Sequence, residues 1–194
     1  MNPLARVDQL ARLHIDRAEA RSRQDPCANV CTVANVDEHG RPQARVLVLR
    51  DIEDELAIFV NTTSPKWSCL DDVNVVVWLP SISVQYRLTC TTSPIAETSV
   101  HESWHLRDDP PKRMDWYYTT VQAQSSRVGD RDYLLASLAA LKLPEPLVAP
   151  STAQGLFLRA SFIDRLDLGQ PNGVHDRRCF EWAHDAWQES VLVP

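Results

Sequence analysis

Residues 30–50 read VCTVANVDEHGRPQARVLVLR, and this stretch decides the fold class. Two runs rich in β-branched residues flank the sequence DEHG, which ends on Gly40 and is typical of a tight turn. Alternate residues in each run share a face, as they do in a β-strand. The stretch therefore predicts a β-hairpin whose second strand runs from Ala44 to Arg50.

Further strands surround a helical middle segment. Apolar runs predict strands at residues 56–60, 73–79, 82–91, 155–168, 179–183 and 187–193. Apolar residues spaced three and four apart predict an N-terminal helix within residues 1–25. A polar helical insertion is expected over residues 97–142, with breaks at Pro110-Pro111 and around Gly129.

This order of elements predicts one mainly β domain over residues 1–194. A chain of 194 residues is long enough for one sizeable core. Five strands are followed by helices and then by C-terminal strands within residues 155–194, whereas a Rossmann-type sheet would alternate strands with long helices. A mostly antiparallel sheet of this size tends to close on itself and so remove its edges. We therefore expect an α+β fold built on a β-barrel with flanking helices.

Charge and composition exclude several classes of function. The formal net charge is −6, so a nucleic-acid partner, which requires a positive face, is not expected. No run approaches the ~20 apolar residues of a membrane helix, and the charged N-terminus does not resemble a secretory signal. The five cysteines include no C-x-x-C pair, which favours neither a disulfide framework nor a metal site and indicates the cytoplasm.

Two basic segments are candidates for neutralising a phosphate. Arg45 interrupts an apolar strand, where an unpaired guanidinium is costly and a bound anion would offset that cost. The alternative is an edge arginine paired with a carboxylate. In Ser64-Pro65-Lys66, Ser64 is a candidate N-cap, so a helix N-terminus and Lys66 would together favour an anion. The alternative there is a lysine that faces solvent.

Two polar clusters lie farther along the chain. Residues 124–127 read QSSR and can donate several hydrogen bonds, although a plain loop would explain them as well. Residues 175–178 read HDRR, and alternation places His175 and Arg177 on one face of a strand. The alternative is a surface patch of salt bridges. The sequence contains no glycine-rich phosphate loop, so side chains would have to hold a phosphate.

Read in order, these segments resemble the pyridoxine/pyridoxamine 5′-phosphate oxidase family of FMN-binding split barrels. The resemblance extends from about Ala28 to Pro194, and residues 124–127 match the family's Q-S-S-R motif. The other matching segments are 31–50, 59–62, 64–66, Gln85, 174–177 and 191–194. Each match is weak alone, but their order and spacing together are specific.

The resemblance implies FMN as cofactor and a homodimer with the flavin in a cleft between two subunits. The cofactor-binding residues that it implies are Arg45, Val46, Leu47, Val48, Leu49, Arg50, Val60, Asn61, Ser64, Lys66, Gln85, Gln124, Ser125 and Arg177. Within that set, Arg45, Lys66, Gln124 and Ser125 would hold the phosphate and ribityl chain. The implied substrate-binding residues are Arg50, Arg107 and His175, and the implied catalytic residues are His175 and Arg177.

Several positions depart from the family's pattern. Pro65 stands in place of an arginine, and Gly173 stands in place of the arginine that opens the family's R-L-H-D-R motif. Leu166 or Asp167 stands where a flavin-contacting tryptophan is expected, and Ser103 lies near the position of a tyrosine that binds substrate phosphate. The FMN-binding set is therefore largely intact, while the substrate-binding set is only partly so.

The function that the resemblance implies is an FMN-dependent oxidoreductase, as in pyridoxine biosynthesis. A hydride would pass from a small amine or alcohol to flavin N5, with O2 as the electron acceptor. One alternative is an FMN-binding flavin reductase or flavin carrier without pyridoxamine phosphate oxidase activity. A second alternative is a dimeric β-barrel that binds no flavin.

Overall fold

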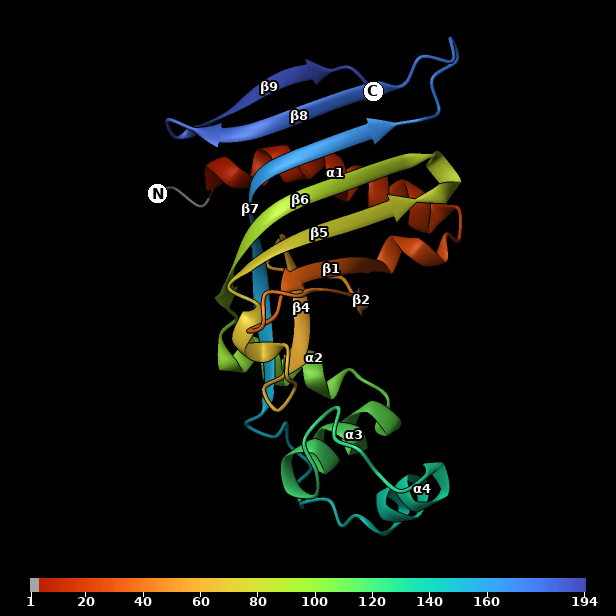
Figure 1. Ribbon diagram of the computed structural model, residues 1–194, viewed down its shortest axis with the longest axis vertical. Coiled ribbons are helices and arrows are strands. Elements are labelled where there is room, and N and C mark those ends of the chain that lie inside the picture. The colour runs from red at the N-terminus through yellow and green to blue at the C-terminus, as the bar shows by residue number, and fades with distance from the viewer. Residues whose placement is uncertain (1–3) are drawn as a thin grey trace. The chain divides into compact units, whose positions relative to one another are not determined.

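The computed structural model describes residues 4–194, and it describes side chains from Leu10 onward (Figure 1). The helices are α1 (Leu4–Ser22), α2 (Glu97–His105), α3 (Asp109–Thr120) and α4 (Arg131–Ala140), with single 3₁₀ turns at Pro26–Asn29, Trp67–Cys69 and Pro80–Ile82. The strands are β1 (Val30–Val36), β2 (Pro42–Val48), β3 (Arg50–Ile52), β4 (Glu55–Asn61), β5 (Asp72–Leu79), β6 (Val84–Pro94), β7 (Ala153–Asp167), β8 (Asp176–Ala183) and β9 (Ala186–Leu192). The predicted mainly β fold with flanking helices is confirmed.

The strands form one sheet in the order β2-β1-β5-β6-β7-β4-β3, and β7 also pairs with β8, which pairs with β9. The pairs β1–β2, β1–β5, β3–β4, β5–β6, β7–β8 and β8–β9 are antiparallel. The predicted first hairpin is confirmed, with Val33 opposite Arg45 in its register. Strand β2 is an edge of the sheet, so one of its sides has no strand partner within the described chain.

The chain divides into two compact units. Unit 1 comprises residues up to 58, 69–93 and 157–194, and unit 2 comprises residues 59–68 and 94–156. Strands β4 and β7 each run from one unit into the other, so no single linker separates the units. The expectation of one domain over residues 1–194 stays a prediction.

The core of unit 1 lies between α1 and the sheet, and α1 runs behind β5 and β6 (Figure 1). Strand β5 alternates buried and exposed residues because one face meets the core and the other does not. The face of α1 that packs inward carries Leu10 and Leu13, and it also buries the charged residues Asp16 and Arg17. Buried charges of this kind require partners, and both side chains have them.

The core of unit 2 is small and centres on Trp104 of α2. Its indole is 1% exposed and packs with Ala149 and Ala153, with Trp116 and Leu147 at the margin. Helix α4 begins at its N-cap Asp130, whose side chain accepts a hydrogen bond from the Tyr133 amide at 2.7 Å. None of the residues of α4 is buried, so this helix contributes no residue to the core of unit 2.

Three local predictions are wrong. The run from Ala44 to Arg50 is not one strand, because β2 ends at Val48 and Arg50 begins β3. Only one 3₁₀ turn follows Ser64, and it starts at Trp67, so no helix N-terminus is available to bind an anion there. The helix break predicted at Pro110-Pro111 lies earlier, at residues 106–108 between α2 and α3, and the two prolines fall in the first turn of α3, where the missing amide hydrogens cost nothing.

Within residues 4–194, no helix combines the length and the apolar character that crossing a bilayer requires. In the same part of the chain, no group of three or more His, Cys, Asp or Glu side chains is arranged to hold a metal ion.

Candidate functional site

The residues predicted to bind FMN and substrate fall into both units. Unit 1 holds Arg45, Val46, Leu47, Val48, Leu49, Arg50, Gln85, His175 and Arg177. Unit 2 holds Val60, Asn61, Ser64, Lys66, Arg107, Gln124 and Ser125.

Arg45 is held by a neutral partner. Its guanidinium donates to the side-chain oxygen of Asn35, which is only 7% exposed, across the β1–β2 hairpin. No carboxylate among residues 10–194 forms an ion pair with Arg45, so the alternative of an arginine paired with a carboxylate is wrong. A carboxamide fixes the direction of a guanidinium without cancelling its charge. Arg45 therefore presents a positive charge on an edge strand.

The rest of the β2–β3 segment alternates between surface and core. Val46 is 66% exposed and Val48 is 51% exposed, whereas Leu49 is 2% exposed and belongs to the core. Leu47 is half-buried, and Arg50 is exposed at the start of β3. Because the chain breaks at Leu49, Arg45 lies on β2 and Arg50 lies on β3. The two side chains therefore cannot be placed relative to each other by the alternation of one strand.

In unit 2, a loop after β4 is tied together by hydroxyl and amide groups. The side-chain oxygen of buried Asn61 accepts from the Thr63 amide and hydroxyl at 3.1 and 2.7 Å, and its nitrogen donates to the Thr152 hydroxyl at 3.2 Å. Lys66 Nζ donates to the Ser64 hydroxyl at 2.8 Å. The backbone N–H of Gln124 also donates to the Thr63 hydroxyl at 3.1 Å. Four predicted residues of this unit therefore lie in one region, namely Asn61, Ser64, Lys66 and Gln124.

The QSSR segment contains an unsatisfied acceptor and a strained residue. The side-chain oxygen of Gln124 is buried and has no hydrogen-bond partner. Ser125 is exposed and has a φ of 71°, a left-handed conformation that non-glycine residues adopt mainly where function or local contacts require it. The chemistry of both residues suits a polar ligand that would supply the missing donor.

Arg177 of β8 is paired with a buried carboxylate. Asp164 on β7 accepts from Arg177 Nη2 at 2.9 Å, and it also accepts from Arg87. Burial raises the pKa of Asp164, but the hydrogen bonds from Arg177 and Arg87 outweigh it, so that the pKa lies below its ordinary value. One carboxylate therefore serves two guanidiniums, and the pair of arginines keeps an excess of positive charge.

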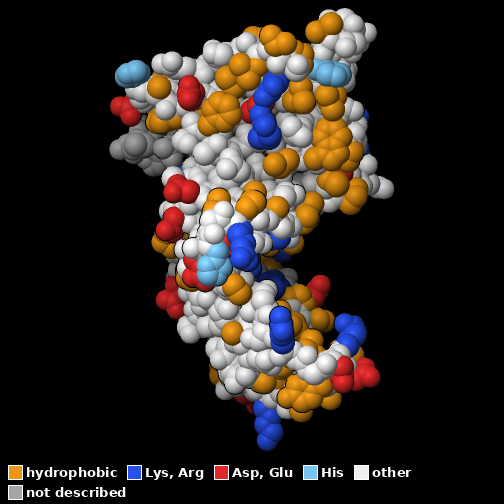
Figure 2. Space-filling view, viewed as in Figure 1, with side chains coloured by type: hydrophobic (Ala, Val, Ile, Leu, Met, Phe, Trp, Pro, Cys, Tyr) orange, Lys and Arg blue, Asp and Glu red, His pale blue; other side chains and the backbone are white. Residues whose placement is uncertain are grey.

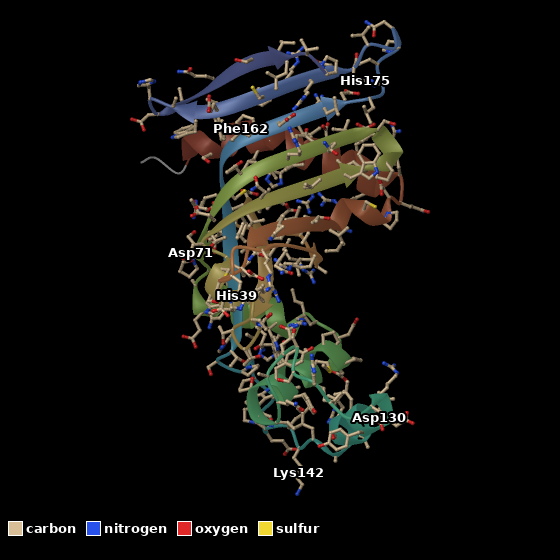
Figure 3. The ribbon with its side chains drawn as sticks, viewed as in Figure 1. His39, Asp71, Asp130, Lys142, Phe162 and His175 are labelled. Atoms are coloured by element: carbon tan, nitrogen blue, oxygen red, sulfur yellow. The ribbon has the colours of Figure 1, made fainter. Side chains whose placement is uncertain are left out.

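The HDRR segment only partly matches its predicted arrangement. His175 lies in the loop one residue before β8 and is exposed (Figure 3), so it is not part of the strand alternation that includes Arg177. Arg178 forms ion pairs with Asp176 and Glu189 at 3.0 and 2.7 Å. The alternative of a surface salt-bridge patch is therefore correct for Arg178. Arg177 instead forms its ion pair with the buried Asp164.

Arg107 of unit 2 is paired with a carboxylate of its own. Its Nη1 atom donates to Asp115 Oδ2 at 2.5 Å, and the Trp104 indole donates to the same oxygen at 3.0 Å. Asp115 lies on α3 and is 6% exposed. Its negative charge contributes, after burial, to raising the pKa of the neighbouring Tyr118.

Unit 1 also holds a buried polar network that the sequence analysis did not include. Asp16 of α1 accepts from the Tyr86 hydroxyl at 2.5 Å and from Arg165 Nε at 3.1 Å. A shallow pocket of about 210 Å³ lies beside it, and its charged lining consists of Arg12, Asp16, Glu19, Arg23, Arg165 and Asp167. Equal numbers of arginines and carboxylates line the pocket, so it has no net charge. The network fastens α1 to the sheet.

Three residues that partner the predicted arginines were not predicted from the sequence, namely Asn35, Asp115 and Asp164. Asp164 follows two apolar residues within a strand, the same signal that singled out Arg45, and could have been found in that way. Asn35 interrupts an apolar run in the same way, and Asp115 lies between Met114 and Trp116, but no sequence pattern shows which arginine either of them contacts. Their role depends on which arginine the fold brings to them.

Comparison with known proteins points to one family. No family model matches the chain. The chain is 28% identical over 185 residues to a pyridoxine/pyridoxamine 5′-phosphate oxidase of Chromohalobacter salexigens, covering 91% of this chain and 84% of that protein. It is 27% identical over 188 residues to the enzyme of the same name from Microcystis aeruginosa, covering 93% of this chain and 85% of that protein.

Solved structures share the fold along the whole chain. PhzG from Burkholderia lata, in complex with tetrahydrophenazine-1-carboxylic acid, has a TM-score of 0.80 at 20% identity and covers 100% of this chain and 95% of its own. A pyridoxamine 5′-phosphate oxidase-related, FMN-binding protein from Nostoc punctiforme has a TM-score of 0.76 at 17% identity, with coverages of 100% and 98%. The predicted resemblance is therefore confirmed: over most of its length the chain is similar to pyridoxine/pyridoxamine 5′-phosphate oxidases, and it shares a split-barrel fold with these two solved structures.

Proposed function

We propose that this protein is an FMN-dependent oxidoreductase that oxidises a small amine or alcohol and uses O2 as its electron acceptor. The observation that carries the proposal is the positive charge of Arg45, which a buried carboxamide orients and no carboxylate of residues 10–194 cancels. Similarity to curated oxidases over nine-tenths of the chain supports the same reaction class.

The residues present suit FMN. Arg45 and Lys66 supply cationic groups for its phosphate, and a guanidinium can bind phosphate through two parallel hydrogen bonds. Gln124, with a buried oxygen that lacks a donor, suits the hydroxyl groups of the ribityl chain, next to Ser125. The backbone of residues 46–49 and 60–61 would line the flavin, Gln85 would hydrogen-bond its ring, and Arg177 would lie against it.

FMN would supply the redox chemistry when bound, because its ring can accept one hydride, which carries two electrons, and can pass those two electrons to O2. The role of the chain is to hold the substrate near the flavin, and Arg50, Arg107 and His175 are the groups proposed to contact it. His175 is exposed, and an imidazole can both accept and donate a proton, which suits it to carry one. Arg177, held by Asp164, would place positive charge at the ring.

A homodimer is part of the proposal. The edge strand β2 exposes Val46 and Val48, and its partner β1 ends at Val36, which is 59% exposed. Hydrophobic side chains also reach the surface around the β8–β9 hairpin (Figure 2), where Val174 is 63% and Val191 is 72% exposed. Exposed apolar edges of this kind are normally covered in native proteins, and a second copy of the chain would cover them.

A cytoplasmic location is also proposed. None of the five cysteines forms a disulfide, although Cys31 and Cys90 are buried in the sheet. Thiols of this kind persist in a reducing compartment.

The absorption spectrum of the purified protein tests the proposal. Flavin absorbance that bleaches when an amine or alcohol substrate is added without oxygen, and returns with oxygen, is the expected result. Stable flavin absorbance that only a nicotinamide cofactor bleaches would favour the flavin reductase alternative, and absorbance that nothing bleaches would favour the carrier. A colourless protein that takes up no added FMN would refute the proposal and favour the barrel without flavin.

A further inference from the structure

The charge of Arg107 is cancelled within its own unit. Asp115 Oδ2 lies 2.5 Å from Arg107 Nη1, and the side chains of the two residues are 9% and 30% exposed. The carboxylate is buried beside Trp104, whose indole holds the same oxygen at 3.0 Å. Removal of a buried carboxylate from such partners is costly, so the ion pair is a fixed part of unit 2.

Two further cations of α3, Lys112 and Arg113, have partners other than Asp115. Arg113 donates to the backbone oxygens of Leu138 and Leu141 at 3.1 and 2.8 Å, which fixes it at the end of α4. Lys112 lies over the Trp104 ring, with its nitrogen 5.6 Å from the ring centroid. Arg107 therefore keeps hydrogen-bond donors but contributes little net positive charge.

We infer that the substrate of this protein carries no phosphate where it meets Arg107. The inference rests on the proposed function, in which Arg107 contacts the substrate. A phosphomonoester carries nearly two negative charges at neutral pH, and the buried carboxylate of Asp115 would repel them. A neutral acceptor, such as a hydroxyl or amide oxygen, can accept from the remaining guanidinium hydrogens without that repulsion. The substrate class is thus an unphosphorylated amine or alcohol.

Asp115 has one other conceivable role, which is to orient Arg107 toward a phosphate. The two roles predict opposite effects of the same substitution. If Asp115 repels phosphate, then Asp115→Asn, which keeps the size of the side chain, should admit a phosphorylated ligand. If Asp115 orients Arg107 for phosphate, then the same variant should bind that ligand more weakly.

The experiment compares pyridoxamine with pyridoxamine 5′-phosphate as probes, by calorimetric titration of the protein with FMN added. The wild-type protein should bind the two probes within about threefold of each other, and Asp115→Asn should bind the phosphorylated probe about tenfold more tightly with no change for pyridoxamine. Asp109→Asn is the matched control, because it removes an exposed carboxylate from the first turn of the same helix and should behave as wild type. In the double variant Asp115→Asn with Arg107→Gln, the tighter binding of the phosphorylated probe should disappear.

A wild-type preference for the phosphorylated probe of about tenfold or more would overturn the inference, as would an Asp115→Asn variant that shows no gain. If Asp115→Asn does not fold, Arg107→Gln decides: an unchanged ratio of the two dissociation constants supports the inference, and a selective loss of the phosphorylated probe overturns it. Flavin uptake is read from visible absorbance before any probe is added. A colourless protein therefore refutes the proposed function, and the same titrations without FMN still test the role of Asp115.

Discussion

Arg45 of unit 1 and Arg107 of unit 2 are both arginines that the family resemblance assigns to ligand binding, but their partners differ. Arg45 is held by the neutral Asn35, whereas Arg107 is held by the carboxylate of Asp115. Each partner is buried and each fixes a guanidinium, yet only the first leaves the positive charge available to an anion. The charge that an arginine presents to a ligand therefore depends on its partner as well as on its own identity.

The largest expected effect is on FMN affinity when both phosphate-binding cations are removed. Arg45→Ala combined with Lys66→Ala should raise the dissociation constant for FMN by about 100- to 10,000-fold, because each charged hydrogen bond contributes roughly 1.5–3 kcal/mol. Titration of the protein with FMN, followed by quenching of flavin fluorescence, measures it. Arg41→Ala removes an exposed arginine from the same hairpin and is the control. An unchanged dissociation constant in the double variant would reject the phosphate site.

A smaller effect is expected when the Arg45 site is converted into the Arg107 arrangement. Asn35→Asp places a carboxylate against Arg45, and FMN affinity should fall about tenfold because the phosphate then meets a cancelled charge. The same titration measures it. Asn74→Asp adds the same charge to an exposed position of β5 in the same sheet and should leave the affinity near that of wild type. If Asn35→Asp binds FMN as well as wild type, the charge of Arg45 is not what holds the cofactor.

The ion pair between Arg17 and Asp51 is structural. We expect pH to change the stability of the fold through this pair, without a change in FMN binding. Burial of Asp51 would raise its pKa, but hydrogen bonds from His14 and Arg17 outweigh burial and lower it to about 2. Because the pKa is about 4 in the unfolded chain, the pair stabilises the fold above about pH 4, and the stabilisation is lost as the pH falls toward 2. We expect a contribution of about 1 kcal/mol, discounted for solvent because the side chain is 32% exposed.

Urea unfolding of wild type and of Asp51→Asn at a series of pH values measures that contribution. The difference in the free energy of unfolding between the two proteins should shrink as the pH falls from about 4 toward 2. A difference that grows on acidification would contradict the assigned pKa direction. FMN affinity at neutral pH should be the same in both proteins.

The smallest effect on FMN affinity is expected at His175. The residue is exposed in the loop before β8, so His175→Ala should leave the dissociation constant for FMN within about twofold of wild type. The rate at which an amine or alcohol substrate bleaches the flavin should fall a few-fold, and anaerobic stopped-flow absorbance measures it. Loss of flavin from the variant would show that His175 contacts the cofactor instead of the substrate.

Much of the fold could be predicted because its signals are local. The first hairpin, α1, and strands β4 to β9 follow from apolar periodicity and turn residues within single segments. The errors lie where local signals compete. Leu49 continues an apolar run, yet it lies between the end of β2 at Val48 and the start of β3 at Arg50, where the chain stops pairing with β1 and begins to pair with β4. Pro110-Pro111 marked a helix break in sequence, but proline is equally at home in a first turn.

The candidate site could be predicted only in part. The sequence named Arg45, Lys66, Arg107 and Arg177, because cations in apolar or motif contexts are visible in a linear pattern. Three of these cations have partners that lie 8 to 13 residues away along the chain, on another strand or on a helix. The partners are Asn35, Asp115 and Asp164. Pairing between two strands, or between a loop residue such as Arg107 and a helix, is decided by geometry, and no spacing rule reveals it.

The sequence alone determined the order of strands and helices, the antiparallel hairpin and the positions of the cationic residues, because those features depend on neighbours within a few residues. The tertiary structure decided which charges are available. It set a buried amide against Arg45, a buried carboxylate against Arg107 and a shared carboxylate between Arg87 and Arg177. The physical reason is that electrostatic energy depends on distance and burial in space, and only the folded chain fixes both.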